Sequence, residues 1–214
     1  MHFNYIDTSW SKLVDTEMGD YVLNYMNAPG REYHNAEHVA IMWQHAKTLG
    51  MDYDATLDAA ILWHDFEYDA EPNKELRSAE SMQAVARNNP EWFRDVDVGK
   101  AAELILTTIS HNYVHDLDMR LVKLDLFDLT LSHARYTNFW NILAESVALY
   151  GIDAKEAARA SEQFLKGFAL RMDQNSEADK ETPFFWFAVA EGARETVLMS
   201  RVVQDTYRYE LKNS

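Results

Sequence analysis

Apolar residues recur at helical spacing along almost the whole chain, and this periodicity is the strongest constraint on its fold. Between Ser9 and Met26, for example, the intervals are mostly three or four residues, at Trp10, Leu13, Val14, Met18, Val22, Leu23 and Met26. Residues at these intervals share one face of an α-helix, whereas the strands of a half-buried sheet would alternate strictly. The sequence has no alternating run long enough to predict a strand, so we expect an all-α protein.

Helix-breaking residues divide this pattern into segments of ordinary helix length. The sequence predicts about eight or nine helices, within residues 9–26, 38–49, 54–63, 78–87, 98–109, 117–133, 136–150, 153–171 and 184–203. Residues 68–77 resemble a loop, and the polar tail, 205–214, is expected to fray. Packing in the core is the expected role of the aromatic cluster Phe184-Phe185-Trp186-Phe187.

Length and composition favour a soluble cytoplasmic protein with one substantial core. The chain has 214 residues, of which 47% are hydrophobic, and no Cys. Without Cys, disulfides and thiolate ligands are excluded, so a metal site would have to use His and carboxylate ligands. The sequence shows neither a signal-like N-terminus nor a long apolar run, so we expect no contact with a membrane.

The net charge of −15 disfavours nucleic acid as a partner, because proteins that follow a phosphate backbone rely on clustered Lys and Arg. It leaves a small anionic substrate open, since a divalent cation and a few basic residues can reverse the field inside one pocket. Solubility is the simplest explanation of the excess acid.

The stretch Ile61-Leu62-Trp63-His64-Asp65-Phe66-Glu67-Tyr68-Asp69 ends a predicted helix in an adjacent His-Asp pair. On a helix, neighbouring side chains point about 100° apart, so His64 and Asp65 would reach one ion only if it lay between their directions. An imidazole nitrogen and a carboxylate oxygen suit a divalent ion such as Mn²⁺, Fe²⁺, Ni²⁺, Co²⁺, Zn²⁺ or Mg²⁺. The alternative is a capped helix end with a solvated Asp.

Two other stretches strengthen the metal interpretation. Upstream, His34 and His38 would share one helical face if the segment were helical throughout; alternatively, Asn35 caps the helix and leaves His34 at its mouth. Downstream, Asp125 lies within the apolar run 121–129. A buried carboxylate needs a partner, and a metal ion is one.

These residues resemble a known family. His38, His64-Asp65 and Asp125 are similar to the metal-binding pattern of the HD-domain metal-dependent phosphohydrolases, and Tyr33-His34-Asn35-Ala36-Glu37-His38 resembles the first motif of cyclic nucleotide phosphodiesterases, Tyr-His-Asn-x-x-His. The chain most resembles a bacterial and phage-type group of predicted HD-superfamily phosphohydrolases. That group shares three elements, which here read Arg31 to His38, His64 to Asp69 and Asn73 to Ser78. The resemblance covers about Trp10 to about Arg201.

The resemblance implies a single HD-type helical domain over residues 1–214. Its metal-binding core would span about 31–133, and C-terminal helices at about 136–203 would pack on it. The implied metal ligands are His38, His64, Asp65 and Asp125, with Asp125 rather than its neighbour Asp128 at the metal. In the phosphodiesterases the first His of the motif protonates the leaving group, which implies the same role for His34.

Further roles are implied for four residues near these motifs. His111 sits where the group usually has a His, as a support for the metal site or a phosphate contact, or else only as a helix-end residue. Asp69 would orient water or a His, and Arg77 or Lys74 would neutralise phosphate charge. The alternative for Asp69 and Arg77 is a salt bridge between two loops.

Two hypotheses follow for the whole chain. The first is a metal-dependent phosphohydrolase that cleaves a nucleotide or similar small phosphate ester with metal-activated water, as a nucleotidase, triphosphohydrolase or phosphodiesterase. The second is a helical binding or regulatory domain that a metal only stabilises. Open coordination positions and a spare His34 favour the enzyme. We expect one ion rather than two, because the extra histidines of a two-ion site are not evident from the spacing, and a homo-oligomer stays open.

Overall fold

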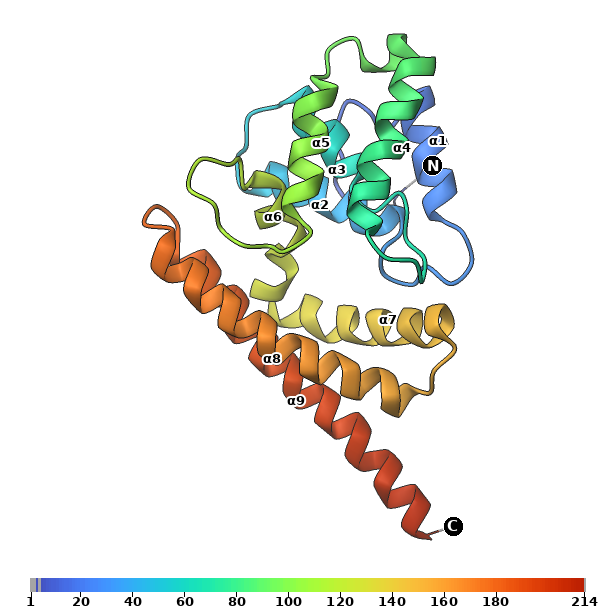
Figure 1. Cartoon of the computed structure of the whole chain (residues 1–214), viewed down its shortest axis with the longest axis vertical. Coiled ribbons are helices and arrows are strands. Elements are labelled where there is room, and N and C mark those ends of the chain that lie inside the picture. Colours follow the sequence, from blue (N-terminus) through green and yellow to red (C-terminus); the bar gives the residue numbers. More distant parts are fainter. Residues whose placement is uncertain (1–2, 4, 214) are drawn as a thin grey trace. The chain divides into compact units, whose positions relative to one another are not determined.

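The computed structural model describes residue 3 and residues 5–213, with the side chains of 207–213 left undescribed. Within this part the chain forms nine α-helices, two short 3₁₀ helices and no strand, which confirms the all-α prediction (Figure 1). The elements are α1 (Glu17–Met26), α2 (Ala36–Thr48), α3 (Ala55–Trp63), α4 (Lys74–Asn88), η1 (Pro90–Phe93), α5 (Val98–Thr107), α6 (Arg120–Asp125), η2 (Phe127–Thr130), α7 (Ser132–Tyr150), α8 (Ala154–Ala178) and α9 (Pro183–Asn213).

The expected fraying of 205–214 falls mostly on residues whose side chains lie outside the described part; the backbone of α9 is helical to Asn213. None of the helices in the described part is long and apolar enough to cross a membrane.

By its backbone contacts the chain divides into two compact units. The first contains Met1–His111 and Asp118–Asp125, and the second contains Asn112–Leu117 and Leu126–Ser214. Helices α1 to α6 therefore belong to the first unit and α7 to α9 to the second. The first unit begins at the N-terminus and ends at Asp125, whereas the core predicted from the sequence spans about 31–133. The single-domain layout stays a prediction.

Helix α3 is the centre of the first unit. It contacts α1, α2, α4, α5 and α6, and every residue from Leu57 to Trp63 is buried. A helix that is apolar on nearly all sides is stable only inside a core. The Asp54 side chain fixes its start by accepting hydrogen bonds from the Thr56 and Leu57 backbone N–H groups, at 2.9 and 3.2 Å. Packing in the core thus fixes the position of the end of α3, and with it the position of His64.

One polar residue of α3, Asp58, is also buried and holds the N-terminal segment. Its carboxylate accepts hydrogen bonds from Ser11 Oγ at 2.8 Å and from the Lys12 backbone N–H at 2.9 Å. Burial raises the pKa of this carboxyl to about 6, against the lowering effect of these hydrogen bonds. Helix α1 begins after this segment, at Glu17, with the Thr16 side chain as its cap, and so occupies only the later part of the predicted range 9–26.

The prediction of one continuous helix over 117–133 is wrong. Helix α6 ends at Asp125, η2 follows at Phe127–Thr130, and α7 begins at Ser132. Asp128, expected beside Asp125 on the same helical side, belongs to the second unit. There its carboxylate accepts a hydrogen bond from Asn138 Nδ2 at 2.8 Å. The break gives the two carboxylates different environments.

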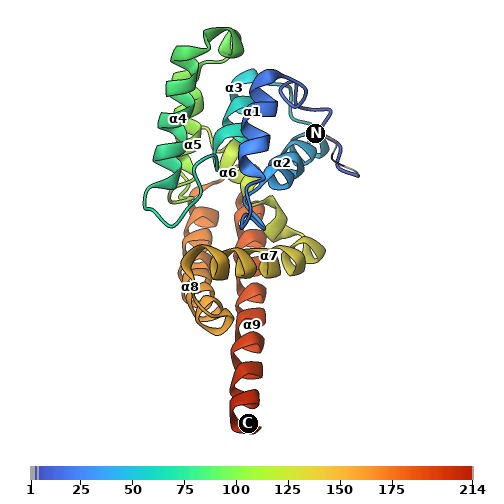
Figure 2. The same cartoon turned by 90° about the vertical axis from the view of Figure 1, so that its right-hand side faces the viewer.

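In the second unit, α8 and α9 lie side by side along much of their length, and α7 contacts both (Figures 1 and 2). The turn between α8 and α9 is fixed by Asp179, whose carboxylate accepts hydrogen bonds from Thr182 Oγ1 at 2.6 Å and Trp186 Nε1 at 2.8 Å. Gly192 of α9 lies against η2: a Cβ built on it would stand 1.9 Å from the Leu129 carbonyl oxygen. Only glycine permits this approach.

Packing explains only part of the aromatic cluster at the start of α9. Trp186 is fully buried, whereas Phe184 is 85% exposed and Phe187 is 53% exposed.

Candidate metal centre

His38 is placed by the cap of α2. The Asn35 side chain accepts hydrogen bonds from the Glu37 and His38 backbone N–H groups, at 2.9 and 3.3 Å. His38 therefore stands in the first turn of the helix, buried, while His34 precedes the helix. Of the two arrangements that the sequence leaves open, the capped one is present.

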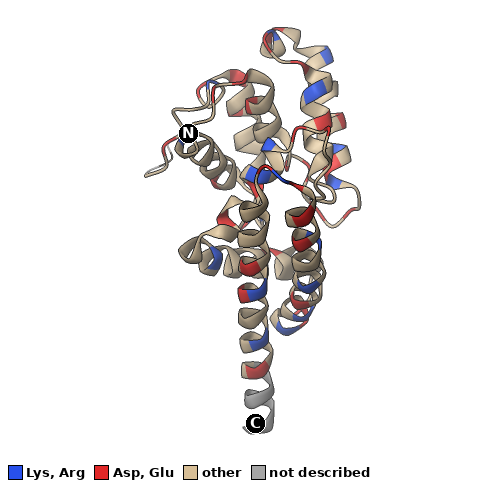
Figure 3. Cartoon of the chain, turned by 90° about the vertical axis from the view of Figure 1, so that its left-hand side faces the viewer, with Lys and Arg blue, Asp and Glu red and all other residues tan. Residues whose placement is uncertain are grey.

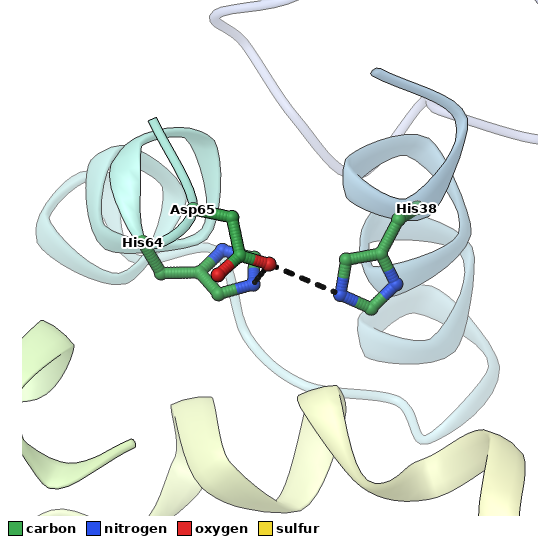
Figure 4. A group of neighbouring side chains, drawn as sticks. All are labelled: His38, His64 and Asp65. Atoms are coloured by element: carbon green, nitrogen blue, oxygen red, sulfur yellow. Dashed lines mark ion pairs between the residues drawn. The ribbon is translucent and has the colours of Figure 1, made fainter. Parts of the chain in front are cut away.

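His64 and Asp65 converge directly after α3 ends at Trp63. His64 caps the helix with backbone angles that are still helical, φ −60° and ψ −35°, and Asp65 lies in the turn that follows. Figure 4 shows the Asp65 carboxylate between the imidazoles of His64 and His38. The Arg31 guanidinium holds the turn by donating to the backbone carbonyls of Asp65 at 3.1 Å and Phe66 at 2.6 Å.

His38, His64 and Asp65 form a group that could hold a metal ion. Their ligand atoms all lie within 4.8 Å of one another. Asp65 Oδ2 is 2.9 Å from His64 Nε2 and 3.8 Å from His38 Nε2. Ligand atoms at about 2.1 Å from one ion stand about 3 to 4.2 Å apart, so these separations suit a single ion without large rearrangement.

Asp125 joins this group from α6, which packs against α2, α3 and α5. Its Oδ1 lies 3.2 Å from His38 Nε2 and 3.9 Å from His64 Nε2, again within the range for shared ligands. Its other oxygen, Oδ2, lies 3.1 Å from His111 Nε2. His111 has a positive φ of 55°, a conformation that non-glycine residues seldom adopt. The structure thus brings His111 to the carboxylate that the sequence assigns to the metal.

The tautomer of His64 is fixed by the backbone. Its Nδ1 lies 2.8 Å from the Ile61 carbonyl oxygen, which can only accept a hydrogen bond, so Nδ1 carries the proton. In the neutral ring Nε2 then presents a lone pair, and it faces two carboxylate oxygens. This buried atom has no hydrogen-bond partner among the described residues, although Asp65 Oδ2 is only 2.9 Å away. Either a proton on Nε2 or a metal ion between the nitrogen and the carboxylates removes this repulsion, and metal-binding histidines are commonly held in this way by a backbone carbonyl.

The electrostatics of the group call for positive charge. Burial lowers the pKa of the His64 imidazole, but the charges of Asp65 and Asp125 outweigh it and raise this pKa to about 9. Burial likewise opposes ionisation of Asp65, yet His64 and His34 hold its pKa well below the usual range. Hydrogen bonds from His111 and His38 have the same effect on the pKa of Asp125, against the cost of burial. Both carboxylates are therefore ionised at neutral pH.

His34 belongs to a stack of rings beside this group. Its imidazole lies nearly parallel to the Tyr68 ring, with centroids 3.9 Å apart, and meets Tyr33 edge-on at 4.7 Å. The Lys74 ammonium lies 3.7 Å from the centroid of the Tyr68 ring. The centroids of His34 and His38 are 6.0 Å apart, so His34 lies near the candidate metal ligands.

Asp69 and Arg77 form the salt bridge that the sequence leaves as an alternative. Arg77 donates to both carboxylate oxygens of Asp69, at 3.0 and 2.5 Å. The bridge joins a loop to a helix rather than two loops, because α4 begins at Lys74 and includes Arg77. The Arg77 guanidinium lowers the pKa of the Asp69 carboxyl, so each charge neutralises the other.

Sequence reasoning missed the roles of Arg31 and Tyr68. Both stand within motifs quoted above, so their presence carried a signal. Their partners are backbone carbonyls and a stacked ring, which no spacing in the sequence specifies.

Comparisons with known proteins add nothing to this geometry: a scan against protein-family models finds no matching family, and searches of curated proteins and of solved structures find no match.

Proposed function

We propose that the protein is a divalent-metal-dependent phosphohydrolase that acts on a nucleotide or a similar small phosphate ester. The observation that carries the proposal is the convergence of His38, His64 and Asp65 on one buried place, where His64 Nε2 lies 2.9 Å from Asp65 Oδ2 and 3.9 Å from Asp125 Oδ1. The motif resemblance to HD-domain phosphohydrolases supports the reaction class. The substrate class rests on that resemblance alone.

His38, His64, Asp65 and Asp125 would hold one ion, and two histidines with two carboxylates leave coordination positions open. A divalent ion bound there would supply Lewis-acid polarisation of a phosphate oxygen and of water. The two histidines are almost fully buried, whereas the side chains of Asp65 and Asp125 are 12% and 16% exposed. Substrate and water would therefore approach on the side of the carboxylates.

His34 would protonate the leaving oxygen. Its ring is held by Tyr68 and Tyr33, so its direction is set before a substrate arrives. His111 would keep Asp125 oriented through their 3.1 Å contact. Lys74 is the better candidate for a phosphate contact than Arg77, since the Arg77 guanidinium already donates two hydrogen bonds to the Asp69 carboxylate.

Metal binding is tested first. The wild-type protein, dialysed against Mn²⁺ and then freed of loose metal, should hold close to one equivalent by elemental analysis. His64→Ala should lose at least about 90% of it, because one of the ligands is removed. His45→Ala is the matched control: His45 is also buried and lies on α2, but outside the group, and this variant should retain the metal. Equal metal in wild type and His64→Ala would contradict the site.

Activity is tested on the same samples with nucleoside mono-, di-, tri- and cyclic phosphates. The metal-loaded wild type should release phosphate or open a cyclic ester, and His34→Ala should lower kcat by about 10²- to 10⁴-fold with metal retained. The loss should be smaller for p-nitrophenyl phosphate esters, whose leaving group needs little protonation. Metal binding without turnover of any of these would favour the second hypothesis, a regulatory domain stabilised by metal.

A further inference from the structure

Helix α9 carries an exposed stripe of apolar residues that its own unit does not cover. The members are Phe184, Phe187, Leu198 and Val202, which are 85%, 53%, 58% and 64% exposed. They follow one another with Glu191 and Arg194 at intervals of three and four residues, so all six lie on one helical face. The opposite face of α9 is buried, with Trp186, Ala193 and Val197 among its members.

The apolar area of this stripe is large for a face turned to water. Phe side chains bury about 150–250 Å² each, so the exposed parts of Phe184 and Phe187 alone amount to roughly 200–350 Å². Leu198 and Val202 extend the stripe to a length of about 27 Å, at about 1.5 Å per residue. Exposed apolar patches of several hundred Å² usually mark an interaction surface.

The centre of the stripe is charged, and the two charges are opposite. Glu191 and Arg194 stand one turn apart and form an ion pair within the helix, at 2.5 Å. Arg194 also pairs with Asp173 of α8. Figure 3 shows that acidic and basic residues both occur along α9. A partner of this face must therefore be apolar at both ends and carry an acid and a base at its middle.

A second copy of α9, running antiparallel, meets this requirement. Counted from the midpoint between Gly192 and Ala193, Glu191 and Arg194 lie at equal distances on opposite sides. Phe187 and Leu198 do so as well, and Phe184 and Val202 nearly so. A two-fold axis through that midpoint sets Glu191 of each copy against Arg194 of the other, and Phe187 against Leu198. A parallel pair would instead set Glu191 against Glu191.

We propose that the exposed stripe of α9 is a self-association surface, on which two copies of this chain pair antiparallel about an axis near Gly192 and Ala193. The pairing buries the four apolar side chains of each copy against those of the other. The charges at the centre fix direction and register, as charged positions do in helical pairs. The proposal is independent of the proposed function.

The first experiment measures the mass of the wild type in solution by sedimentation at micromolar concentrations. A dimer is expected. Leu198→Glu should weaken it by about 100-fold, because it places a carboxylate against Phe187 of the other copy. Tyr150→Glu is the matched control, since Tyr150 is 49% exposed but lies at the end of α7, outside the stripe. A monomeric wild type, or a Leu198→Glu variant that dimerises as well as Tyr150→Glu, would overturn the proposal.

The second experiment tests the contact between the central charges of the two copies, and the third tests direction. Glu191→Arg alone sets Arg against Arg twice across the axis, and Arg194→Glu alone sets Glu against Glu, so each variant should be monomeric. Mixed, the two should form a mixed dimer, because each Arg then faces a Glu. Dimers of either variant alone, or no association on mixing, would exclude this register.

Arg194→Glu also loses the ion pair with Asp173 and could fail to fold for that reason. A third experiment therefore tests the pairing without changing Arg194. The chain has no Cys, so single cysteines can be introduced without background. Phe187→Cys in one copy and Leu198→Cys in the other should crosslink with a short bis-maleimide when mixed. Neither variant alone should do so, since like positions lie about 16 Å apart along the axis. Crosslinking of a single variant with itself would indicate a parallel pair and contradict the proposal.

Discussion

Asp125 and Asp128 show how a difference of three residues separates two carboxylates chemically. Asp125 faces His38, His64 and His111, whereas Asp128 accepts a hydrogen bond from Asn138 in the second unit. The same residue type, in one apolar run of the sequence, thus serves a candidate metal site in one case and a helix contact in the other.

The first prediction follows from this difference. Asp125→Asn should weaken Mn²⁺ binding by at least about 10- to 100-fold, because the site loses one of its two charged ligands. Asp128→Asn should bind Mn²⁺ like the wild type and lose about 0.5–1.5 kcal/mol of unfolding free energy with its hydrogen bond. Metal titration and urea unfolding of both variants measure the two effects. Loss of metal in Asp128→Asn with retention in Asp125→Asn would reverse the assignment.

At the scale of residues, the sequence predicts which residues form the candidate site better than it predicts the contacts that hold them. His38, His64 and Asp65 were predicted as metal ligands from their resemblance to HD-domain motifs, and in the structure they lie together. The Arg31 contacts with backbone carbonyls depend on the shape of the turn after Asp65, which no pattern of side chains specifies. The Asp69–Arg77 bridge was foreseen only as an alternative, because opposite charges eight residues apart meet only if the loop folds back.

At the scale of the elements, the close packing of α9 against η2 depends on one glycine, Gly192. A methyl group at Gly192 would stand 1.9 Å from the Leu129 carbonyl oxygen and 2.9 Å from its carbon, so backbone would have to move. Gly167, in the interior of α8, has no such neighbour: the closest atom to a new Cβ is Arg171 Nη1, at 3.8 Å.

The second prediction compares these two glycines. Gly192→Ala should destabilise the protein by about 1–3 kcal/mol or more, as overpacking against backbone does. Gly167→Ala should stabilise it by about 0.5–1 kcal/mol, because alanine loses less conformational freedom in a helix. Chemical unfolding of both variants checks this. A Gly192→Ala protein as stable as Gly167→Ala would show that α9 does not pack closely on η2.

Element boundaries were predictable where the signals are local. Helix α5 begins at Val98 as predicted, with the Asp97 side chain as its cap, and α7 ends at Tyr150 before Gly151. Boundaries set by distant contacts were not. Residues 9–16 lie outside α1 despite their helical spacing, and there Ser11 and Lys12 donate hydrogen bonds to Asp58, which is 47 and 46 residues away.

On the scale of the whole molecule, the first unit is discontinuous in sequence. Its first segment ends at His111, and its second segment runs from Asp118 to Asp125. The returning segment is α6, whose Leu121 and Leu124 are buried in the core around α3. Length and composition predict a core of sufficient size, but they carry no information on how the chain divides.

The third prediction uses this division. A fragment of residues 1–125 should bind Mn²⁺ with an affinity within about 10-fold of the full chain, since it holds all four candidate ligands. A fragment of residues 1–111 should bind at least about 100-fold more weakly and be less stable, because it lacks Asp125 and the buried leucines of α6. Calorimetric titration and circular dichroism of the two fragments test this. Equal binding by both would show that α6 is dispensable.

The return of the chain through α6 also sets an order of events during synthesis on the ribosome. The nascent chain presents His38, His64 and Asp65 long before Asp125, and six residues destined for the other unit emerge in between. Until α6 leaves the exit tunnel, the growing polypeptide lacks both a ligand and part of its core. The candidate site is therefore complete only after α6 has emerged, so a chain that stalls or is cut before Asp125 would lack one of its four candidate ligands.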